Sequence, residues 1–421
     1  MKKIFALALT IILIMTLSFF APQKIYAQNL EAISDTQEFM DRFLDDCPNR
    51  TSFSEDEKRA AEWLAQEFES FGLQTKTQTF DAVFDNKKLT SQNVIAKLDL
   101  GKSKQVIISA HYDNLYGSKD IEGFGAEGAY NNGSGVAVML SLAKRFSELK
   151  EEGNLNLDFN IIFLALGGDE PGLYGASYYV KNMMPREISG TLLAVNLDCV
   201  GGGDYLYLYC DELSTVHEKY IKDIADKNNL DIKLPPANKK TATASTPLVP
   251  YLHYGLNSAN IYFLSAGINS ANFFSRNWDT NNKIGIVESE KNKPIIYTVD
   301  DNRETLRRLY GDSFIKKMNT AANIIFYALT DKDFVKTMEQ SSANKPDYKW
   351  LVNSSLMAYI KFGLIVIMIA AVILIVRNLN VRYPVPVITI RPTPPPTVFG
   401  EEYENKDKDK DNDQKTPFDG Y

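Results

Sequence analysis

The chain has 421 residues, of which 44% are hydrophobic and 24% charged, and its formal net charge is −7. This composition is ordinary for a globular protein, and an acidic balance without a basic stripe argues against nucleic acid as a partner. Three cysteines, Cys47, Cys199 and Cys210, are too few for a disulfide framework, although one pair is possible outside the cytoplasm.

The first segment along the chain has the features of an export signal. Two lysines precede an apolar run over residues 4–20, and Ala27 offers a cleavage point. A positive start, an apolar centre and a small-residue exit are typical of a secretory signal, so we expect residues 1–27 to be removed. An uncleaved signal anchor is the alternative, which Pro22 disfavours because it would break a membrane helix.

Residues 28–347 are predicted to form one extracytoplasmic domain, because their number suffices for one core without demanding two. The first confident element is a helix over 55–71. Ser54 can cap this helix, and Glu57 completes a capping box.

Short apolar runs then alternate with helical stretches. We expect buried strands at 105–110, 159–165 and 192–200, a possible strand at 260–264, and helices at 136–146, 173–182 and 303–330, the last interrupted near Gly311. Strands alternating with helices predict an α/β domain with a mostly parallel central sheet and helices on both faces. We interpret Cys199 as a small core residue and His217 as a surface residue of a helix.

Polar side chains follow three of these predicted strands. His111 and Asp113 follow the first, Asp169 and Glu170 the second, and Asp198 the third. Because sites in such sheets form beyond the carboxyl ends of the strands, we expect these groups to converge. Histidine nitrogen and carboxylate oxygen suit zinc, whereas each group alone is simply a polar residue that leaves a strand for solvent. The three groups together indicate a site.

An apolar run over 362–376 follows the domain. Extended back to residue 354, after a juxtamembrane segment at 348–353, it is long enough to cross a hydrocarbon core of ~30 Å. Arginines after the span place that side in the cytoplasm. We therefore expect one transmembrane helix over 354–376 in the cell membrane, with the domain outside; a buried core helix is the alternative.

Residues 377–421 are rich first in proline and then in charged residues, so we expect a disordered cytoplasmic tail. Pro392 and Pro395 form a Pro-x-x-Pro pattern, which some domains bind in extended form. A solvated tail without a partner is the simpler interpretation. The sequence does not specify an oligomeric state.

Several short motifs occur together in the order of one known family. They are Cys-Pro-Asn-Arg at 47–50, Ala-Ala-Glu-Trp-Leu at 60–64, Asn-Val-Ile-Ala-Lys at 93–97, Ser-Ala-His-Tyr-Asp at 109–113, Asp-Glu-x-Gly-Leu-x-Gly-Ala at 169–176 and Asn-Leu-Asp-x-Val-Gly at 196–201. With them, the region from about Pro48 to Tyr327 resembles the co-catalytic zinc aminopeptidases of metallopeptidase family twenty-eight, which include glutamate-carboxypeptidase-like proteins.

The resemblance implies a mixed sheet flanked by helices and two zinc ions held by a His, a bridging Asp, a Glu, an Asp and a final His. A water shared by the metals attacks the first peptide bond, and a carboxylate beside the metal-binding Glu takes its proton. By this resemblance, His111, Glu170 and Asp198 are metal ligands. Asp113 orients His111, and Asp169 stands where the family has its Glu base.

Two ligand positions depart from the family pattern. Tyr130 aligns with the bridging Asp and Tyr297 with the final His. Without the shared negative charge two neighbouring dications would repel strongly, so we expect one zinc ion or none. The carboxylate of Asp169 is also one methylene shorter than that of the usual base.

Two functions from different classes follow. The first is a non-catalytic domain that binds peptides or extracytoplasmic proteins, which the departures at Tyr130 and Tyr297 favour. The second is an active metallo-exopeptidase with one zinc held by His111, Glu170 and Asp198, since three protein ligands and an open position suffice for catalysis. A serine hydrolase is a distant third, because Ser134 lacks the Gly-x-Ser-x-Gly turn.

Overall fold

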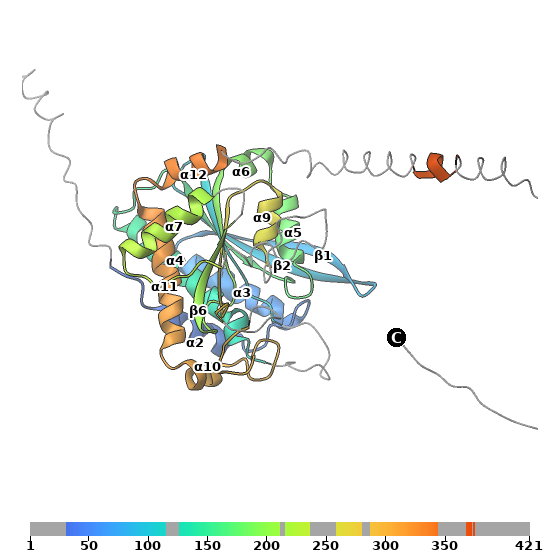
Figure 1. The fold of residues 1–421 in the computed structure, drawn as a ribbon, viewed down its shortest axis with the longest axis horizontal. Helices are drawn as coiled ribbons and strands as arrows, with labels where there is room; N and C mark the ends of the chain where they lie inside the picture. Colours follow the sequence, from blue (N-terminus) through green and yellow to red (C-terminus); the bar gives the residue numbers. More distant parts are fainter. Residues whose placement is uncertain are drawn as a thin grey trace, which may run out of the picture. The chain divides into compact units, whose positions relative to one another are not determined.

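The computed structural model describes residues 31–114, 126–210, 215–235, 258–279, 287–343, 368–372 and 374. The chain divides into two compact units, residues 1–357 and 358–421. The first unit holds the sheet and every named helix. Its centre is a sheet of seven strands in the order β1-β2-β4-β3-β5-β7-β6 (Figure 1).

The strands are β1 (Gln74–Phe84), β2 (Lys87–Leu98), β3 (Gln105–His111), β4 (Asn160–Leu166), β5 (Thr191–Leu197), β6 (Tyr205–Cys210) and β7 (Ser270–Arg276). The four central strands β4, β3, β5 and β7 are parallel to one another. The outer strands β1, β2 and β6 run antiparallel to their neighbours. The sheet is therefore mixed but mostly parallel at its centre, as the sequence predicts.

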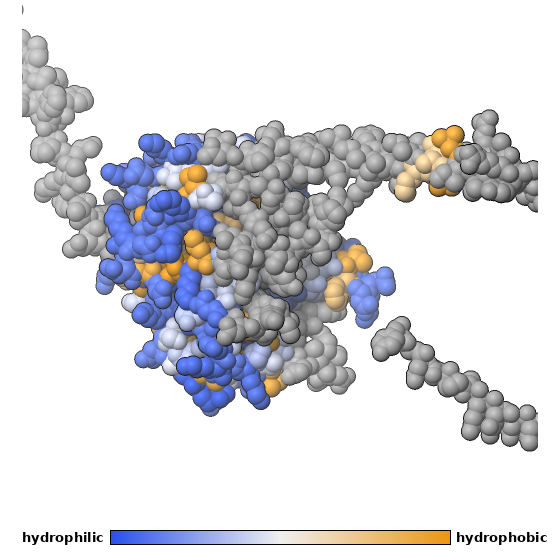
Figure 2. All heavy atoms as spheres, in the orientation of Figure 1, coloured by the Kyte–Doolittle hydropathy of each residue, from blue (hydrophilic) through white to orange (hydrophobic). Residues whose placement is uncertain are grey.

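The helices are α2 (Thr36–Asp46), α3 (Glu55–Ser70), the short η1 (Ala129–Gly133), α4 (Ser134–Glu151), α5 (Tyr174–Lys181), α6 (Pro185–Gly190), α7 (Thr215–Lys227), α9 (Asn260–Ser265), α10 (Arg303–Tyr310), α11 (Ser313–Thr330) and α12 (Phe334–Ala343). Figure 2 shows that the described surface facing the viewer is mostly hydrophilic.

Helices cover both faces of the sheet because the central strands are apolar on both sides. Alternate residues of β3 divide between two cores: Val106 and Ile108 join the larger one, and Ile107 joins the smaller one. The larger core includes side chains of α2, α3, α4 and α11, and the smaller core includes side chains of α5 and α9. Strands buried on both faces are the expected pattern for a sheet with two helical layers.

Most predicted elements are present at nearly the predicted bounds. The helix expected at 55–71 is α3, and the side chain of its cap Ser54 accepts a hydrogen bond from Glu57 N. The expected strands at 105–110 and 159–165 are β3 and β4. The interruption expected near Gly311 separates α10 from α11, and Gly311 has a φ of +54°. A left-handed backbone of this kind favours glycine.

Two predictions inside the domain are wrong. The segment 260–264, expected as a possible strand, is the helix α9, and the missing strand is β7 a few residues later. Short apolar runs do not distinguish a buried strand from a buried helix by periodicity. His217, expected at the surface, is fully buried, and its Nδ1 lies 2.8 Å from the hydroxyl of Ser341.

The expected segments at 1–27, 348–353 and 377–421 lie outside the described residues. Of the expected membrane span, the structure describes residues 368–372 and 374, which are helical. None of the helices in the described part of the chain is both long enough and apolar enough to cross a membrane. All three cysteines are described, and they are buried and free of disulfide bonds.

Candidate functional site

The five predicted site residues lie at the carboxyl ends of three central strands. His111 ends β3, with Asp113 two residues later. Asp169 and Glu170 follow β4, and Asp198 directly follows β5. Since β4, β3 and β5 are parallel neighbours, the structure brings these groups together at one edge of the sheet.

His111 is the centre of this cluster. Its Nδ1 lies 3.1 Å from the backbone oxygen of Asp113 and 3.5 Å from Asp113 Oδ1. Its Nε2 lies 3.7 Å from Asp198 Oδ1 and 3.9 Å from Glu170 Oε1. A carbonyl oxygen can only accept a hydrogen bond, so Nδ1 carries a proton and Nε2 faces the two carboxylates.

Asp113 is fully buried and joins three segments. Its Oδ2 accepts hydrogen bonds from the hydroxyl of Ser52 at 2.6 Å and from Glu170 N at 3.0 Å. The structure thus places Asp113 beside His111 and makes it a support for the backbone of Glu170 as well.

The charges of the cluster favour an internal ion pair. Burial alone would lower the pKa of His111, but Asp113, Asp198 and Glu170 together raise it well above its usual value. Burial raises the pKa of Asp198, but His111 outweighs this effect and the net pKa is lowered. At neutral pH, His111 is therefore an imidazolium beside an ionised Asp198.

Asp169 uses one of its two carboxylate oxygens in a hydrogen bond, and the other, Oδ2, is buried with no partner among the described residues. Its Oδ1 accepts a hydrogen bond from Ala176 N at 2.9 Å, in the first turn of α5. Burial, and next the charge of Asp113, raise the pKa of Asp169 to about 8. A cation bound nearby would lower this pKa again, so the protonation state of Asp169 depends on whether a metal occupies the cluster.

The structure corrects the position expected for the bridging ligand. Tyr130 turns away from the cluster, because its hydroxyl donates a hydrogen bond to the backbone oxygen of Ser275. Asn131, the next residue, donates from Nδ2 to Glu170 Oε1. Asn131 therefore stands beside Glu170, and its neutral amide cannot provide the charge of a bridging carboxylate. The sequence carried a signal for it, a polar residue one position along the same turn.

Tyr297 lies at the edge of the site on a segment held at both ends. The carboxylate of Glu288 accepts hydrogen bonds from Ile295 N at 2.8 Å and from Ile296 N at 3.2 Å. Tyr297 itself is 54% exposed. Burial of its hydroxyl, and next the charge of Glu170, raise the pKa of Tyr297. The side chain of Tyr297 is thus within electrostatic reach of the cluster and remains open to solvent.

At the far end of this segment, Asp301 holds the turn that carries Asn131. Its two carboxylate oxygens accept hydrogen bonds from Tyr130 N at 2.7 Å and from Asn131 N at 3.1 Å. Burial raises the pKa of Asp301 to about 7. Two segments distant in sequence are thereby fixed to each other next to Glu170.

Cys199 also belongs to the cluster. Its φ is +54°, and its Sγ lies 3.1 Å from Asn131 Oδ1, to which the thiol donates. Burial, and next the charge of Asp198, raise the pKa of Cys199 well above the usual thiol value. Cys199 is buried, as predicted. It lies beyond the end of β5 rather than in the strand, and its thiol is neutral.

The donor set does not fit a pair of zinc ions. Asn131 replaces the shared carboxylate, and Tyr297 stands where a second imidazole is expected. Within the described ranges, no three His, Cys, Asp or Glu side chains are grouped so that they could hold a metal ion. The nearest arrangement is His111 with Asp198 and Glu170, in which Glu170 Oε1 already accepts the amide of Asn131.

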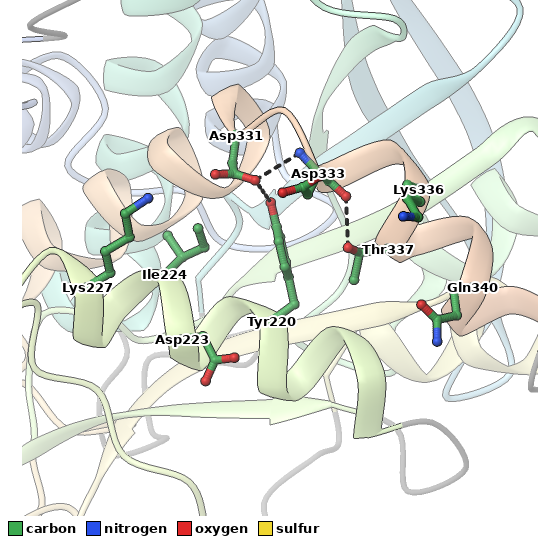
Figure 3. Close-up of a pocket in the computed structure, with 9 residues that line it drawn as sticks. All are labelled: Tyr220, Asp223, Ile224, Lys227, Asp331, Asp333, Lys336, Thr337 and Gln340. Carbon is green, nitrogen blue, oxygen red and sulfur yellow. Dashed lines mark hydrogen bonds between the residues drawn. The ribbon is translucent and has the colours of Figure 1, made fainter. Parts of the chain in front are cut away.

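A separate hollow of about 490 Å³ lies between α7 and α12 (Figure 3). Tyr220 is one of the residues that line it, and its hydroxyl donates a hydrogen bond to Asp331 Oδ1 at 3.1 Å. None of the cluster residues lines this hollow. It is therefore distinct from the site at the strand ends.

Comparison with known proteins agrees with this geometry. The protein-family model described as Peptidase family M28 matches residues 93–307, just over half of the chain. The alkaline phosphatase isozyme conversion protein of Escherichia coli is 28% identical over 264 residues, which are 58% of this chain and 72% of that protein. Aminopeptidase YwaD of Bacillus subtilis is 29% identical over 195 residues, 44% of this chain and 39% of that protein.

A third relative is a subunit of an assembly. The BOS complex subunit NCLN of Homo sapiens is 32% identical over 109 residues, which are 25% of this chain and 19% of that protein. Among solved structures, the zinc aminopeptidase BSAP of Bacillus subtilis matches with a TM-score of 0.55 at 17% identity, covering 72% of this chain and 97% of that one. The glutaminyl cyclase of Porphyromonas gingivalis matches with a TM-score of 0.52 at 18% identity, covering 70% and 98%.

Proposed function

Since the chain belongs to peptidase family M28, we propose that it uses the family's fold to bind peptides or partner proteins outside the cytoplasm without hydrolysing them. The observation that carries this proposal is the pairing of Glu170 with the amide of Asn131. A neutral amide there leaves no carboxylate to share between two metals. Asp169 already uses one carboxylate oxygen as the acceptor for Ala176 N, so only its other oxygen could serve as a base.

The cluster also contains a positive group of its own. The imidazolium of His111 already faces Asp198 and Glu170, so these buried carboxylates have a positive partner within the chain. Any zinc ion would have to displace the proton of His111 and the amide of Asn131. The name of the relative NCLN, a complex subunit, is consistent with a binding role in this family.

A working exopeptidase with one zinc is the second candidate. It is favoured by the distances of 3.7 and 3.9 Å from His111 Nε2 to Asp198 and Glu170, because two carboxylates face the same imidazole nitrogen. Three protein ligands and one open position form an adequate catalytic zinc site. The two candidates predict opposite results for the same measurements.

The test measures zinc content and the hydrolysis of aminoacyl anilides by the purified protein. We expect less than about one tenth of a zinc ion per chain after dialysis, and no hydrolysis above the rate without enzyme. The double variant Asn131→Asp, Tyr297→His restores the two absent ligand types, so we expect it to bind zinc more tightly. It is the positive control for the metal assay.

Zinc bound at one ion per chain in the natural protein, together with hydrolysis that His111→Ala abolishes, would establish the exopeptidase instead. Hydrolysis that persists in His111→Ala would point to a contaminating peptidase. The zinc content and the hydrolysis rate of the natural protein therefore decide between the two candidates. The double variant shows that the assay can detect zinc in this fold.

We also propose that the domain is tethered to the cell membrane by residues 354–376, with the tail at 377–421 in the cytoplasm. This proposal rests on the apolar run, its length and the arginines that follow it. A tethered binding domain would confine its partners to the membrane surface.

A further inference from the structure

Arg276 brings a guanidinium to the same edge of the sheet as the cluster. It is the last residue of β7, and β7 lies next to β5, whose end carries Asp198. Its guanidinium carbon lies 4.5 Å from the centre of the Phe274 ring and 5.8 Å from that of Tyr130. The rings hold the side chain in place, and 17% of the side chain remains exposed.

Most hydrogen-bond donors of Arg276 have no acceptor among the residues that the structure describes. A guanidinium has five N–H groups. Its ion pair is with Glu288, at 3.3 Å, and Glu288 already accepts two backbone N–H groups. Within the described part of the chain, Arg276 donates no hydrogen bond of normal geometry. The side chain is partly exposed, and none of its nitrogens is a fully buried atom without a partner, so its open N–H groups face solvent and can donate to an acceptor on a ligand.

The charges around Arg276 identify the class of acceptor. Asp198, Cys199 and Tyr297 all lie within its electrostatic reach. The site therefore has a positive end at Arg276 and, at its other end, the carboxylates of Glu170 and Asp198, which share the single imidazolium of His111. A ligand with a single charge would be attracted by one end and repelled by the other. A ligand that carries both a cation and an anion can satisfy both ends.

We propose that Arg276 selects peptides whose first residue is acidic: the peptide ammonium faces Glu170 and Asp198, and the side-chain carboxylate accepts hydrogen bonds from the free N–H groups of Arg276. This inference rests on the proposed binding function. The planar fork of a guanidinium matches a carboxylate through two parallel hydrogen bonds, which a neutral amide cannot form. Arg276 is thus a specificity residue of the site.

The test compares three peptides by titration calorimetry on the full-length protein in detergent micelles. Asp-Ala-Ala carries both charges, Asn-Ala-Ala lacks the side-chain charge, and N-acetyl-Asp-Ala-Ala lacks the ammonium. We expect Asp-Ala-Ala to bind about tenfold more tightly than each of the others, which corresponds to one charge-assisted contact. Chromatography of the titration mixture shows whether any peptide is cleaved.

Arg276→Gln should remove the preference for Asp-Ala-Ala over Asn-Ala-Ala. The matched control is Arg145→Gln. Arg145 lies on α4, 19% of its side chain is exposed, and its guanidinium lies over the ring of Phe326 on α11. This control should keep the preference. If Arg276→Gln does not fold, the comparison of peptides on the natural protein still decides the matter.

Equal binding of Asp-Ala-Ala and Asn-Ala-Ala, or no binding of Asp-Ala-Ala at millimolar concentration, would overturn the role of Arg276. Retention of the preference in Arg276→Gln would overturn it as well. Cleavage of the bound peptide would instead refute the non-catalytic function and leave the selectivity intact. The two proposals therefore fail in distinguishable ways.

Discussion

Gly175 lies at the closest approach between α5 and the loop that carries Asp169 and Glu170. A Cβ atom there would overlap the backbone oxygen of Gly167 and lie 2.5 Å from Asn93 Oδ1. Asn93 also donates a hydrogen bond to the backbone oxygen of Gly175 at 3.0 Å. The residue is therefore fixed by backbone and buried polar atoms that cannot move aside separately.

We expect Gly175→Ala to destabilise the protein by about 2 kcal/mol or more, because the added methyl group forces the backbone of this loop apart. The matched control is Gly172→Ala in the same motif. Its Cβ would meet only the ring of Tyr174, at 3.1 Å, and a side-chain ring can shift. Urea unfolding followed by tryptophan fluorescence measures both. Equal midpoints for the two variants would contradict this account.

The start of α3 shows how a local helix signal supports the site. Ser54 accepts from Glu57 N at 3.2 Å, and the carboxylate of Glu57 accepts from Phe53 N at 2.8 Å and from Gly168 N at 2.6 Å. The capping box predicts that the Glu57 carboxylate accepts from Ser54 N, but in the structure it accepts from N of the preceding residue, Phe53. Glu57 thereby joins the first turn of α3 to the loop after β4.

Ser54→Ala should lower the free energy of unfolding by about 1 kcal/mol, since it removes the acceptor for Glu57 N at the helix start. Ser54→Thr keeps the hydroxyl and should lose only a few tenths of a kcal/mol. Thermal denaturation of both variants tests this. A loss as large in the threonine variant as in the alanine variant would mean that the hydroxyl is not the reason for the stability.

Elements with a strong local signal were predictable, and elements fixed by tertiary contacts were not. The continuous apolar run of β4 and the capped helix α3 are recognisable from sequence alone. The hairpin of β1 and β2 was missed because β1 is an edge strand with mostly exposed, polar residues and no continuous apolar pattern. The segment of α9 was predicted as a strand and β7 was not predicted. Arg276, the last residue of β7, was therefore not recognised as a residue at the end of a strand.

At the scale of the whole domain, the order of motifs predicted the family and the mixed sheet, and the strand ends predicted where the polar groups meet. What sequence could not provide was the direction of each side chain at a sharp turn. The sequence alignment placed Tyr130 at the bridging position, but its side chain contacts Ser275. The side chain of the next residue, Asn131, contacts Glu170 instead. Hydrogen bonds from segments distant in the chain, such as those accepted by Asp301, fix that direction.

The last prediction concerns the tether, which belongs to the molecule as a whole. The last helix of the described domain, α12, ends at Ala343, so a chain that stops after residue 347 retains every described element of the sheet unit. Expressed with its own residues 1–27, this shortened chain should appear in the extracytoplasmic fluid. The full chain should remain in the membrane fraction after an alkaline wash and be extracted only by detergent.

The double variant Ile365→Arg, Ile369→Arg separates anchoring by apolar length from any other effect of truncation. Each arginine at the centre of a membrane helix costs about 2.5–3.5 kcal/mol of insertion free energy, so this full-length variant should also leave the membrane. Pro392→Ala, Pro395→Ala in the tail is the control that should stay bound. A natural chain released by the alkaline wash, or a shortened chain that stays in the membrane, would contradict the tether. Because residues 354–376 belong to the same chain as the domain, a tether that passes this test would confine the domain to the membrane, and its site would meet only ligands present there.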